Sequence, residues 1–262
     1  MKIVAVLLIK NEDLYIKKII ENIIDFSDEI LVLENYSTDK TYEIVTDLAK
    51  VESKIKVIRI TDAFDTHRYI EPYVGTNTWI FRVDGDEIYD KEGLVKFKKT
   101  LMTGCYDGWW NVGSNSINIE NINISEGTGT GYLGMMTALA NMSVLKEWHE
   151  GRSERLIGTN RVYIDSFDKN KFKLNTYPVE SFDQSCFRCL HLCFVKRSTV
   201  DKETLQGRLN PVELSKWYRS FLPIVHIVKN AFKGDFSFAS NYKIATYKKG
   251  KKTTIDISDF LK

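Results

Sequence analysis

The feature that most constrains this chain is an apolar run that ends abruptly in acidic residues. Residues 79–83 read Trp-Ile-Phe-Arg-Val and residues 84–88 read Asp-Gly-Asp-Glu-Ile. Aromatic and β-branched residues fit a pleated, buried surface, so the run predicts a central strand of an α/β sheet. Ligands of open α/β sheets bind at the carboxyl ends of the strands. The sequence therefore predicts that Asp84 and Asp86 lie at a ligand-binding edge.

The two aspartates suggest what this edge would bind. In extended backbone Asp84 and Asp86 project to the same side, and Gly85 lets a ligand or metal approach the main chain. Two like charges this close are most easily tolerated beside a divalent cation, and carboxylate oxygens suit Mg²⁺ or Mn²⁺. The alternative is an acidic β-turn at the surface, because Asp-Gly is a common turn pair.

The segments before residue 79 favour the ligand edge. Apolar runs alternate with helical spacing, which predicts a doubly wound parallel sheet with right-handed crossovers. We expect strands over Ile3–Ile9, Glu29–Leu33 and Ile55–Ile60, and helices over Leu14–Phe26, Thr41–Ala49 and Arg68–Val74. The first run is seven residues long and is followed by Lys-Asn-Glu, so we interpret it as a strand and not as a signal peptide.

Three segments at these separations resemble the family 2 glycosyltransferases, which have the GT-A fold. They are the opening strand with Lys10-Asn11-Glu12, the loop Glu34–Thr41, and Asp84-Gly85-Asp86-Glu87 in the position of the family's Asp-x-Asp element. The loop departs from the family's Asp-Asp-Gly-Ser-Thr-Asp-Gly-Thr, because Glu34, Asn35 and Tyr36 replace its first three residues. The resemblance covers about the first third of the chain.

The resemblance implies a set of site residues. Asn11 and Glu12 would border the nucleotide pocket, Glu34 would contact the nucleoside, and Asp39 would cap the following helix. Arg68 lies in the segment that matches the position where the family often has an Arg facing the nucleotide diphosphate. The bidentate donors of arginine suit that role. With the acids, the expected donor-binding residues before residue 90 are Ile9, Asn11, Glu12, Glu34, Arg68, Asp84 and Gly85, and the expected metal ligands there are Asp86 and Asp84.

A later segment, 189–198, resembles the strand-to-loop element that brings a His to the metal and a cation to the diphosphate in many GT-A enzymes. Here His191 would be the metal ligand, and Lys196 and Arg197 would contact the diphosphate. A lone histidine is often a core residue, so both interpretations of His191 stay open.

The expected reaction is inverting transfer, which needs a carboxylate near the acceptor. Glu150 and Glu154 follow the presumed acceptor region and precede the next expected strand, Arg161–Ile164. We prefer Glu154, because the start of a strand would hold it more firmly.

Other patterns allow two interpretations. Cys186, Cys189 and Cys193 surround His191 and are either zinc ligands or small buried side chains in a strand. Trp109-Trp110 could offer an apolar face to a sugar or belong to the core. Strands are expected over Tyr106–Val112 and Ser116–Ile122. Gly129, Gly131 and Gly134 match a dinucleotide fingerprint but do not follow the first strand, so we expect a mobile loop near the acceptor over 126–134.

The predicted fold class is α/β of GT-A type: a mostly parallel nucleotide-binding sheet flanked by helices, with a C-terminal helical and hairpin appendage. We expect a glycosyltransferase domain over 1–205, with a nucleotide-sugar half (1–90) and an acceptor half (91–205), and an extension over 206–262. In that extension, 211–232 has the pattern of amphipathic helices that pack on the domain, dimerise or lie on a membrane, and 242–257 that of a hairpin with a basic tip.

The predicted function is metal-dependent transfer of a sugar from a nucleotide-diphosphate donor to an acceptor hydroxyl, with Mn or Mg as cofactor. The acceptor could be a glycan, a lipid-linked glycan, a protein or a modified nucleic acid. A net charge of +2 gives no excess typical of nucleic-acid binders. We expect a cytoplasmic protein, either free or peripheral at the inner membrane face, and either a monomer or a homodimer. The alternatives are an Asp-x-Asp phosphatase and a non-catalytic glycan- or nucleic-acid-binding module.

Overall fold

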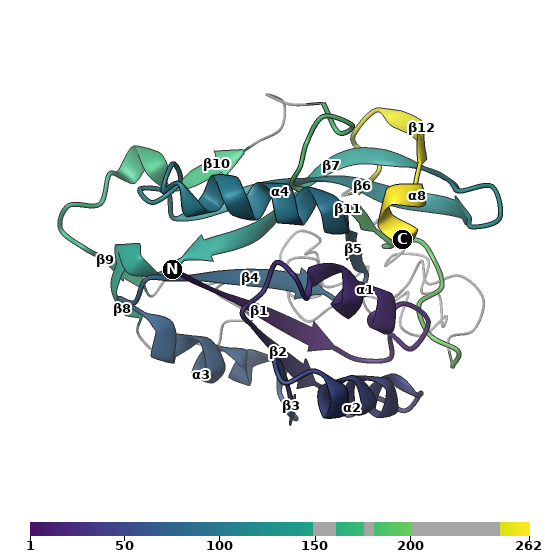
Figure 1. Ribbon diagram of the computed structural model, residues 1–262, viewed down its shortest axis with the longest axis horizontal. Coiled ribbons are helices and arrows are strands. Elements are labelled where there is room, and N and C mark those ends of the chain that lie inside the picture. The colour runs from purple at the N-terminus through teal and green to yellow at the C-terminus, as the bar shows by residue number, and fades with distance from the viewer. Residues whose placement is uncertain (149–160, 176–180, 201–246) are drawn as a thin grey trace, which may run out of the picture.

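The computed structural model describes residues 1–148, 161–175, 181–200 and 247–262 (Figure 1). Ten strands of these residues form one sheet in the order β3-β2-β1-β4-β7-β6-β11-β5, with β10 paired to β6 and β12 paired to β7. The strands are β1 (Lys2–Ile9), β2 (Glu29–Glu34), β3 (Ile55–Arg59), β4 (Thr78–Asp84), β5 (Glu87–Tyr89), β6 (Asn111–Asn123), β7 (Thr128–Asn141), β10 (Lys173–Asn175), β11 (Arg188–His191) and β12 (Lys252–Asp256); β8 (Leu145–Trp148) and β9 (Arg161–Tyr163) form a separate pair.

The N-terminal half of the sheet is parallel, as predicted. Strand β1 pairs in parallel with β2 and β4, and β2 pairs in parallel with β3. The helices that connect or cover these strands are α1 (Ile16–Ile23), α2 (Thr41–Val51), α3 (His67–Ile70), α4 (Lys91–Met102) and α8 (Ser258–Leu261), with short 3₁₀ segments at Ala63–Thr66, Glu71–Tyr73, Met142–Val144 and Lys169–Lys171. These elements confirm the predicted α/β class with a sheet flanked by helices.

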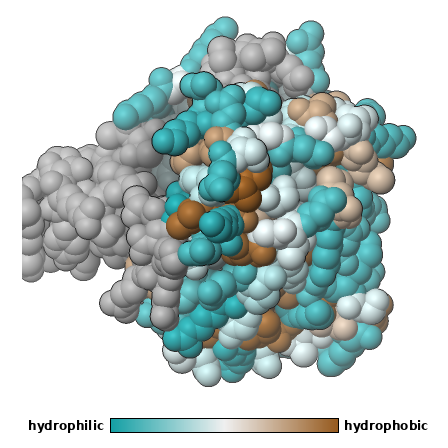
Figure 2. Space-filling model, turned by 90° about the vertical axis from the view of Figure 1, so that its left-hand side faces the viewer, coloured by the Kyte–Doolittle hydropathy of each residue, from teal (hydrophilic) through white to brown (hydrophobic). Residues whose placement is uncertain are grey.

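Both faces of β1, β2 and β4 are largely buried, which explains their mostly apolar sequences, whereas the edge strand β3 is half exposed. In β1 the side chains at 3, 5, 7 and 9 pack with α1, α2, α4 and α8, whereas those at 4 and 6 pack with Ile70 of α3 and Trp148 of β8. Figure 1 shows α1 and α4 on one side of the sheet and α3 on the other. Figure 2 shows a face on which small apolar patches are scattered among hydrophilic residues. Across the described ranges, no helix is long and apolar enough to cross a membrane.

Two expected elements after α4 were wrong. Residues 103–108 form turns and the strand begins only at Asn111, so the strand expected over 106–112 is present only in its last two residues. The mobile loop expected over 126–134 is absent, because β7 begins at Thr128 and pairs with β6. Close packing explains the glycines of β7, because a Cβ on Gly131 would lie 2.3 Å from the main-chain oxygen of Asn118 in β6.

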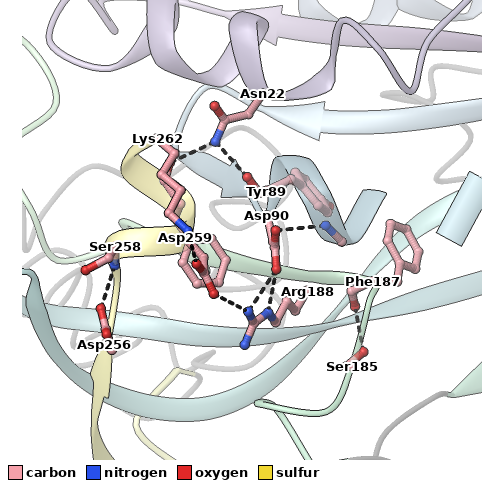
Figure 3. Close-up of polar contacts among 12 residues, drawn as sticks. Asn22, Tyr89, Asp90, Ser185, Phe187, Arg188, Asp256, Ser258, Asp259 and Lys262 are labelled. Carbon is pink, nitrogen blue, oxygen red and sulfur yellow. Dashed lines mark hydrogen bonds and ion pairs between the residues drawn. The ribbon is translucent and has the colours of Figure 1, made fainter. Parts of the chain in front are cut away.

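The C-terminal residues join the same sheet. Strand β12 pairs antiparallel with β7, and Arg188 of β11 lies 2.8 Å from Asp90 and 3.1 Å from Asp259 of α8 (Figure 3). Asp90 also accepts a hydrogen bond from the main-chain nitrogen of Gly93 at the start of α4. The expected helices over 211–232 lie outside the described residues, and the expected hairpin over 242–257 is described only from Tyr247 onward. The division at residue 206 stays a prediction.

Candidate active site

The loops after β1 and β2 are fastened to each other by hydrogen bonds. Asn11 adopts the left-handed conformation with φ of 56°, and its Oδ1 accepts from the main-chain nitrogen of Thr38 at 2.7 Å. The main-chain nitrogen of Glu12 donates to Oγ1 of Thr41 at 2.7 Å. Asp39 accepts from the main-chain nitrogen of Thr41, the first residue of α2, at 2.9 Å, although the N-cap position itself is Lys40 and not Asp39. The predicted donor-binding residues Asn11 and Glu12 thus sit in an ordered edge beside Ile9, the buried last residue of β1.

Glu34 holds its own loop together. Its side chain is fully buried, Oε1 accepts from the main-chain nitrogen of Ser37, and Oε2 lies 2.9 Å from Nε of Arg59. The Arg59 guanidinium carbon also lies 4.1 Å from the centre of the Tyr36 ring, which is 49% exposed. Tyr36 has φ of 47°, the backbone conformation for which the family motif has glycine. The Tyr36 ring therefore faces solvent, whereas the Glu34 carboxylate does not.

The acidic motif forms a turn. The backbone turns at Gly85 and Asp86 between β4 and β5, so the expectation that Asp84 and Asp86 project together from extended backbone was wrong. The turn is not the surface turn of the alternative interpretation, because Asp86 is only 6% exposed. Gly85 also differs from expectation: a Cβ there would lie 2.6 Å from Cγ of Glu12, so the close approach is made by Glu12.

The charged side chains of Glu12, Asp86 and Arg197 lie together. Nη1 of Arg197 forms an ion pair with Oδ2 of Asp86 and lies 3.5 Å from Oε1 of Glu12. All three side chains are less than 10% exposed. Low exposure weakens solvent screening, so these charges interact strongly. The prediction that 189–198 reaches the acidic edge agrees with this geometry for Arg197, whereas Lys196 is exposed to solvent.

His191 also lies next to Asp86. Its Nε2 is 3.6 Å from Oδ2 of Asp86, and its Nδ1 is 2.8 Å from Oδ1 of Asn118 in β6. Burial opposes a charge on the imidazole, but Cys193 and Asp86 outweigh burial and raise the pKa of His191 well above its usual value. Strand pairing brings the histidine here, since β11 pairs antiparallel with β5 and the main-chain nitrogen of Leu192 donates to the main-chain oxygen of Asp86 at 2.8 Å.

The chain after Arg197 is hydrogen-bonded to the loops that follow β1 and β2. Thr199 donates from its main-chain nitrogen and its hydroxyl to Asp13 at 2.8 and 2.5 Å, and Ser198 donates to Asp39 at 2.5 Å. Burial would raise the pKa of Asp39, but hydrogen bonds from Ser198 and Thr41 lower it below its usual value. Ser198 and Thr199 were missed because hydroxyl residues in a loop carry no sequence signal of their distant partners.

Other predicted residues lie apart from this cluster or outside the described chain. Arg68 is exposed on α3 and lies 3.5 Å from Asp65. Glu150 and Glu154 lie outside the described residues. Trp110 is 1% exposed, which places it in the core.

The donor set at Asp86 fits a divalent cation only with help from a ligand. Asp86 and His191 offer an oxygen and a nitrogen suited to Mn²⁺. Within the described part of the chain, no three His, Cys, Asp or Glu side chains converge as a metal site. The other coordination positions would fall to diphosphate oxygens and water. Cys189 and Cys193 are free thiols, 0% and 1% exposed, and burial raises the pKa of Cys189 well above its usual value.

Comparison with known proteins bears on the N-terminal part of the chain. Residues 5–117 match the family model "Glycosyl transferase family 2". Over 94 residues the chain is 34% identical to the SPbeta prophage-derived glycosyltransferase SunS of Bacillus subtilis strain 168, and to glycosyltransferase SunS of Bacillus phage SPbeta. These matches confirm the predicted resemblance. The aligned region is 36% of this chain and 22% of either relative, so the chain covers only a small part of their length.

Solved structures give weaker similarities. The S. aureus TarS 1-349 structure in complex with UDP has a TM-score of 0.35 at 18% identity, covering 47% of this chain and 37% of that one. Glucosyl-3-phosphoglycerate synthase from Mycobacterium tuberculosis, in complex with Mn²⁺ and UDP-glucose, has a TM-score of 0.33 at 21% identity, covering 45% of this chain and 43% of that one. Similarities of this size carry no conclusion about ligands of this chain.

Proposed function

The chain carries a family 2 glycosyltransferase segment over residues 5–117, and from this premise we propose that it transfers a sugar from a nucleotide-diphosphate donor to an acceptor hydroxyl. The observation that carries the proposal is the meeting of Asp86, His191 and Arg197 at the carboxyl ends of the parallel strands β1 and β4. This edge is where α/β sheets bind nucleotides. The charges at this edge suit a diphosphate, because Arg197 is a cation and Asp86 can share a metal ion with the diphosphate.

Asp86 and His191 would hold Mn²⁺ or Mg²⁺, with Asp84 nearby at the end of β4. The metal, when bound, supplies positive charge that stabilises the departing diphosphate. Arg197 adds a fixed guanidinium to the same edge, and the exposed Lys196 can reach a phosphate in solvent. Asn11 and Glu12 line the nucleotide side, and the exposed Tyr36 ring offers a stacking surface there.

Transfer to the acceptor hydroxyl also needs a base. We propose inverting transfer in which Glu154, or alternatively Glu150, takes the acceptor proton. The phosphatase alternative requires Asp84 as nucleophile after a first strand, whereas Asp84 ends the fourth strand of the chain.

The test is release of free nucleotide diphosphate from a panel of nucleotide sugars with added Mn²⁺, starting with UDP-sugars. We expect Asp86→Ala to reduce metal-dependent turnover by about 100-fold or more, because the leaving group loses its charge stabilisation. Asp47→Asn, which changes an exposed carboxylate on α2, is the matched control and should turn over normally. Turnover by Asp86→Ala near that of the control would reject the assignment.

The base is tested separately. Glu154→Gln should bind donor normally but transfer about 100-fold more slowly, since a positioned base contributes at least this much. Transfer within a few-fold of the unmodified protein would remove Glu154 and direct the same measurement to Glu150.

A further inference from the structure

A buried asparagine links the site histidine to the C-terminal segment. Asn118 is 5% exposed, and its Oδ1 lies 2.8 Å from Nδ1 of His191. Its Nδ2 donates to the main-chain oxygen of Tyr247 at 2.9 Å. The Tyr247 ring also meets the His191 ring edge-on, with centroids 5.0 Å apart. The imidazole is therefore enclosed by two segments that are 129 residues apart in the chain.

These contacts determine which histidine nitrogen carries hydrogen. A main-chain carbonyl only accepts hydrogen bonds, so the Asn118 amide must direct its NH₂ toward Tyr247 and its oxygen toward His191. An amide oxygen also only accepts, so Nδ1 of His191 must be the donor. In the neutral imidazole the lone pair then lies on Nε2, the nitrogen 3.6 Å from Asp86.

The strands hold Asn118 firmly in this position. Asn118 of β6 is in register with His191 of β11, and His191 is in register with Glu87 of β5. On the other side, β7 places Gly134 so close that an added Cβ would lie 2.9 Å from Nδ2 of Asn118. The strand register therefore keeps the Asn118 side chain beside His191.

We propose, resting on the proposed function, that Asn118 is a positioning residue that presents the Nε2 lone pair of His191 to the metal beside Asp86. The Tyr247 carbonyl fixes the Asn118 amide, so the C-terminal segment takes part in forming the metal site. Outer hydrogen bonds of this kind set the tautomer and orientation of metal-binding histidines, and their loss typically costs 10- to 100-fold in metal affinity.

Two variants separate the hydrogen bond to His191 from general packing. Asn118→Ala removes the acceptor, and we expect Mn²⁺ affinity, measured by electron paramagnetic resonance in the presence of UDP, to fall about 10- to 100-fold. Asn118→Asp keeps an oxygen facing Nδ1 and should retain affinity within a few-fold. Ser116→Ala is the matched control on the same face of β6: its buried hydroxyl has no hydrogen-bond partner among the described residues, and its removal should leave affinity unchanged.

A second readout needs no metal. The ¹⁵N signals of His191, recorded above the pH at which the imidazole loses its charge, should show the Nδ1–H tautomer in the unmodified protein and in Asn118→Asp. Asn118→Ala should shift the population toward Nε2–H. An Nε2–H tautomer in the unmodified protein, or Mn²⁺ affinity in Asn118→Ala equal to that of Ser116→Ala, would overturn the proposal.

Failure of this proposal differs from failure of the proposed function. An active enzyme whose metal affinity ignores Asn118 loses only the positioning role. A protein that shows the Nδ1–H tautomer and Asn118-dependent Mn²⁺ binding, yet releases no diphosphate from any donor, would keep the positioning role and reject glycosyl transfer.

Discussion

Replacing Arg197 with methionine tests how the buried acids are stabilised. The Arg197, Asp86 and Glu12 side chains are 9%, 8% and 6% exposed. At an effective dielectric constant of about 20, two unit charges at the 3.5 Å separation of Arg197 and Glu12 attract by about 5 kcal/mol before desolvation is counted. Removing one partner of a buried pair typically costs about 3–5 kcal/mol. We expect Arg197→Met to lower the free energy of unfolding by that amount.

Urea unfolding followed by circular dichroism measures this loss. Lys196→Met, at the exposed neighbouring position, is the control and should change stability by about 0.5 kcal/mol or less. The double variant Arg197→Met/Asp86→Asn should recover part of the loss, because one of the two buried charges is then removed. Saturating Mn²⁺ should stabilise Arg197→Met more than the unmodified protein, since the cation replaces the missing charge. A loss no larger than that of Lys196→Met, or a double variant no more stable than the single, would refute the reasoning.

Three further changes test other parts of the fold. Arg188→Met removes the ion pairs that Arg188 makes with Asp90 and Asp259, and we expect it to lower the free energy of unfolding, measured in urea, by about 3 kcal/mol. Asp259→Asn, at the half-exposed partner, should lower it by about 1 kcal/mol or less. Gly131→Ala should cost about 2–3 kcal/mol or prevent folding, because its Cβ would lie 2.3 Å from the main-chain oxygen of Asn118; equal melting temperatures would contradict this. Burial would raise the pKa of Glu29, but two lysine amines at 2.6 Å lower it, so Glu29→Gln should cost about 1 kcal/mol at neutral pH, and the difference should vanish as the pH falls through the lowered pKa; a loss that does not change with pH would contradict it.

The sequence predicts β1, β2 and β4 well because each carries an apolar run that is buried on both faces; β3 is also predicted, although its Lys56 and Arg59 are exposed. It fails for β5 and β7 for two different physical reasons. Strand β5 has only three residues directly after a turn, too few for any periodicity. Strand β7 carries glycines that signal a loop, yet they are required because β6 packs against them.

Charge and resemblance predicted that His191 and Arg197 come to Asp86, and the structure places them there, whereas their roles stay predictions. It could not be predicted where function depends on pairing between distant segments. Asn118 is a buried polar residue in a strand, and only the register between β6 and β11 shows that it faces His191. The available signal was the set of polar residues in β6, Ser114, Asn115, Ser116 and Asn118, since buried polar residues in a strand need partners.

The two parts of the chain contribute unlike charges to the site. The family match ends at residue 117, and within it lie Glu12 and Asp86, whereas Arg197, which pairs with both, lies beyond it. Strand pairing of β11 with β5 and the hydrogen bonds of Thr199 to Asp13 bring this cation to the acids. Burying two carboxylates without a cation is costly, so the acidic edge and the later segment must order together. If the proposed function holds, the donor site would form only when residues 188–199 are docked, and docking of that segment would be a condition for metal and diphosphate binding.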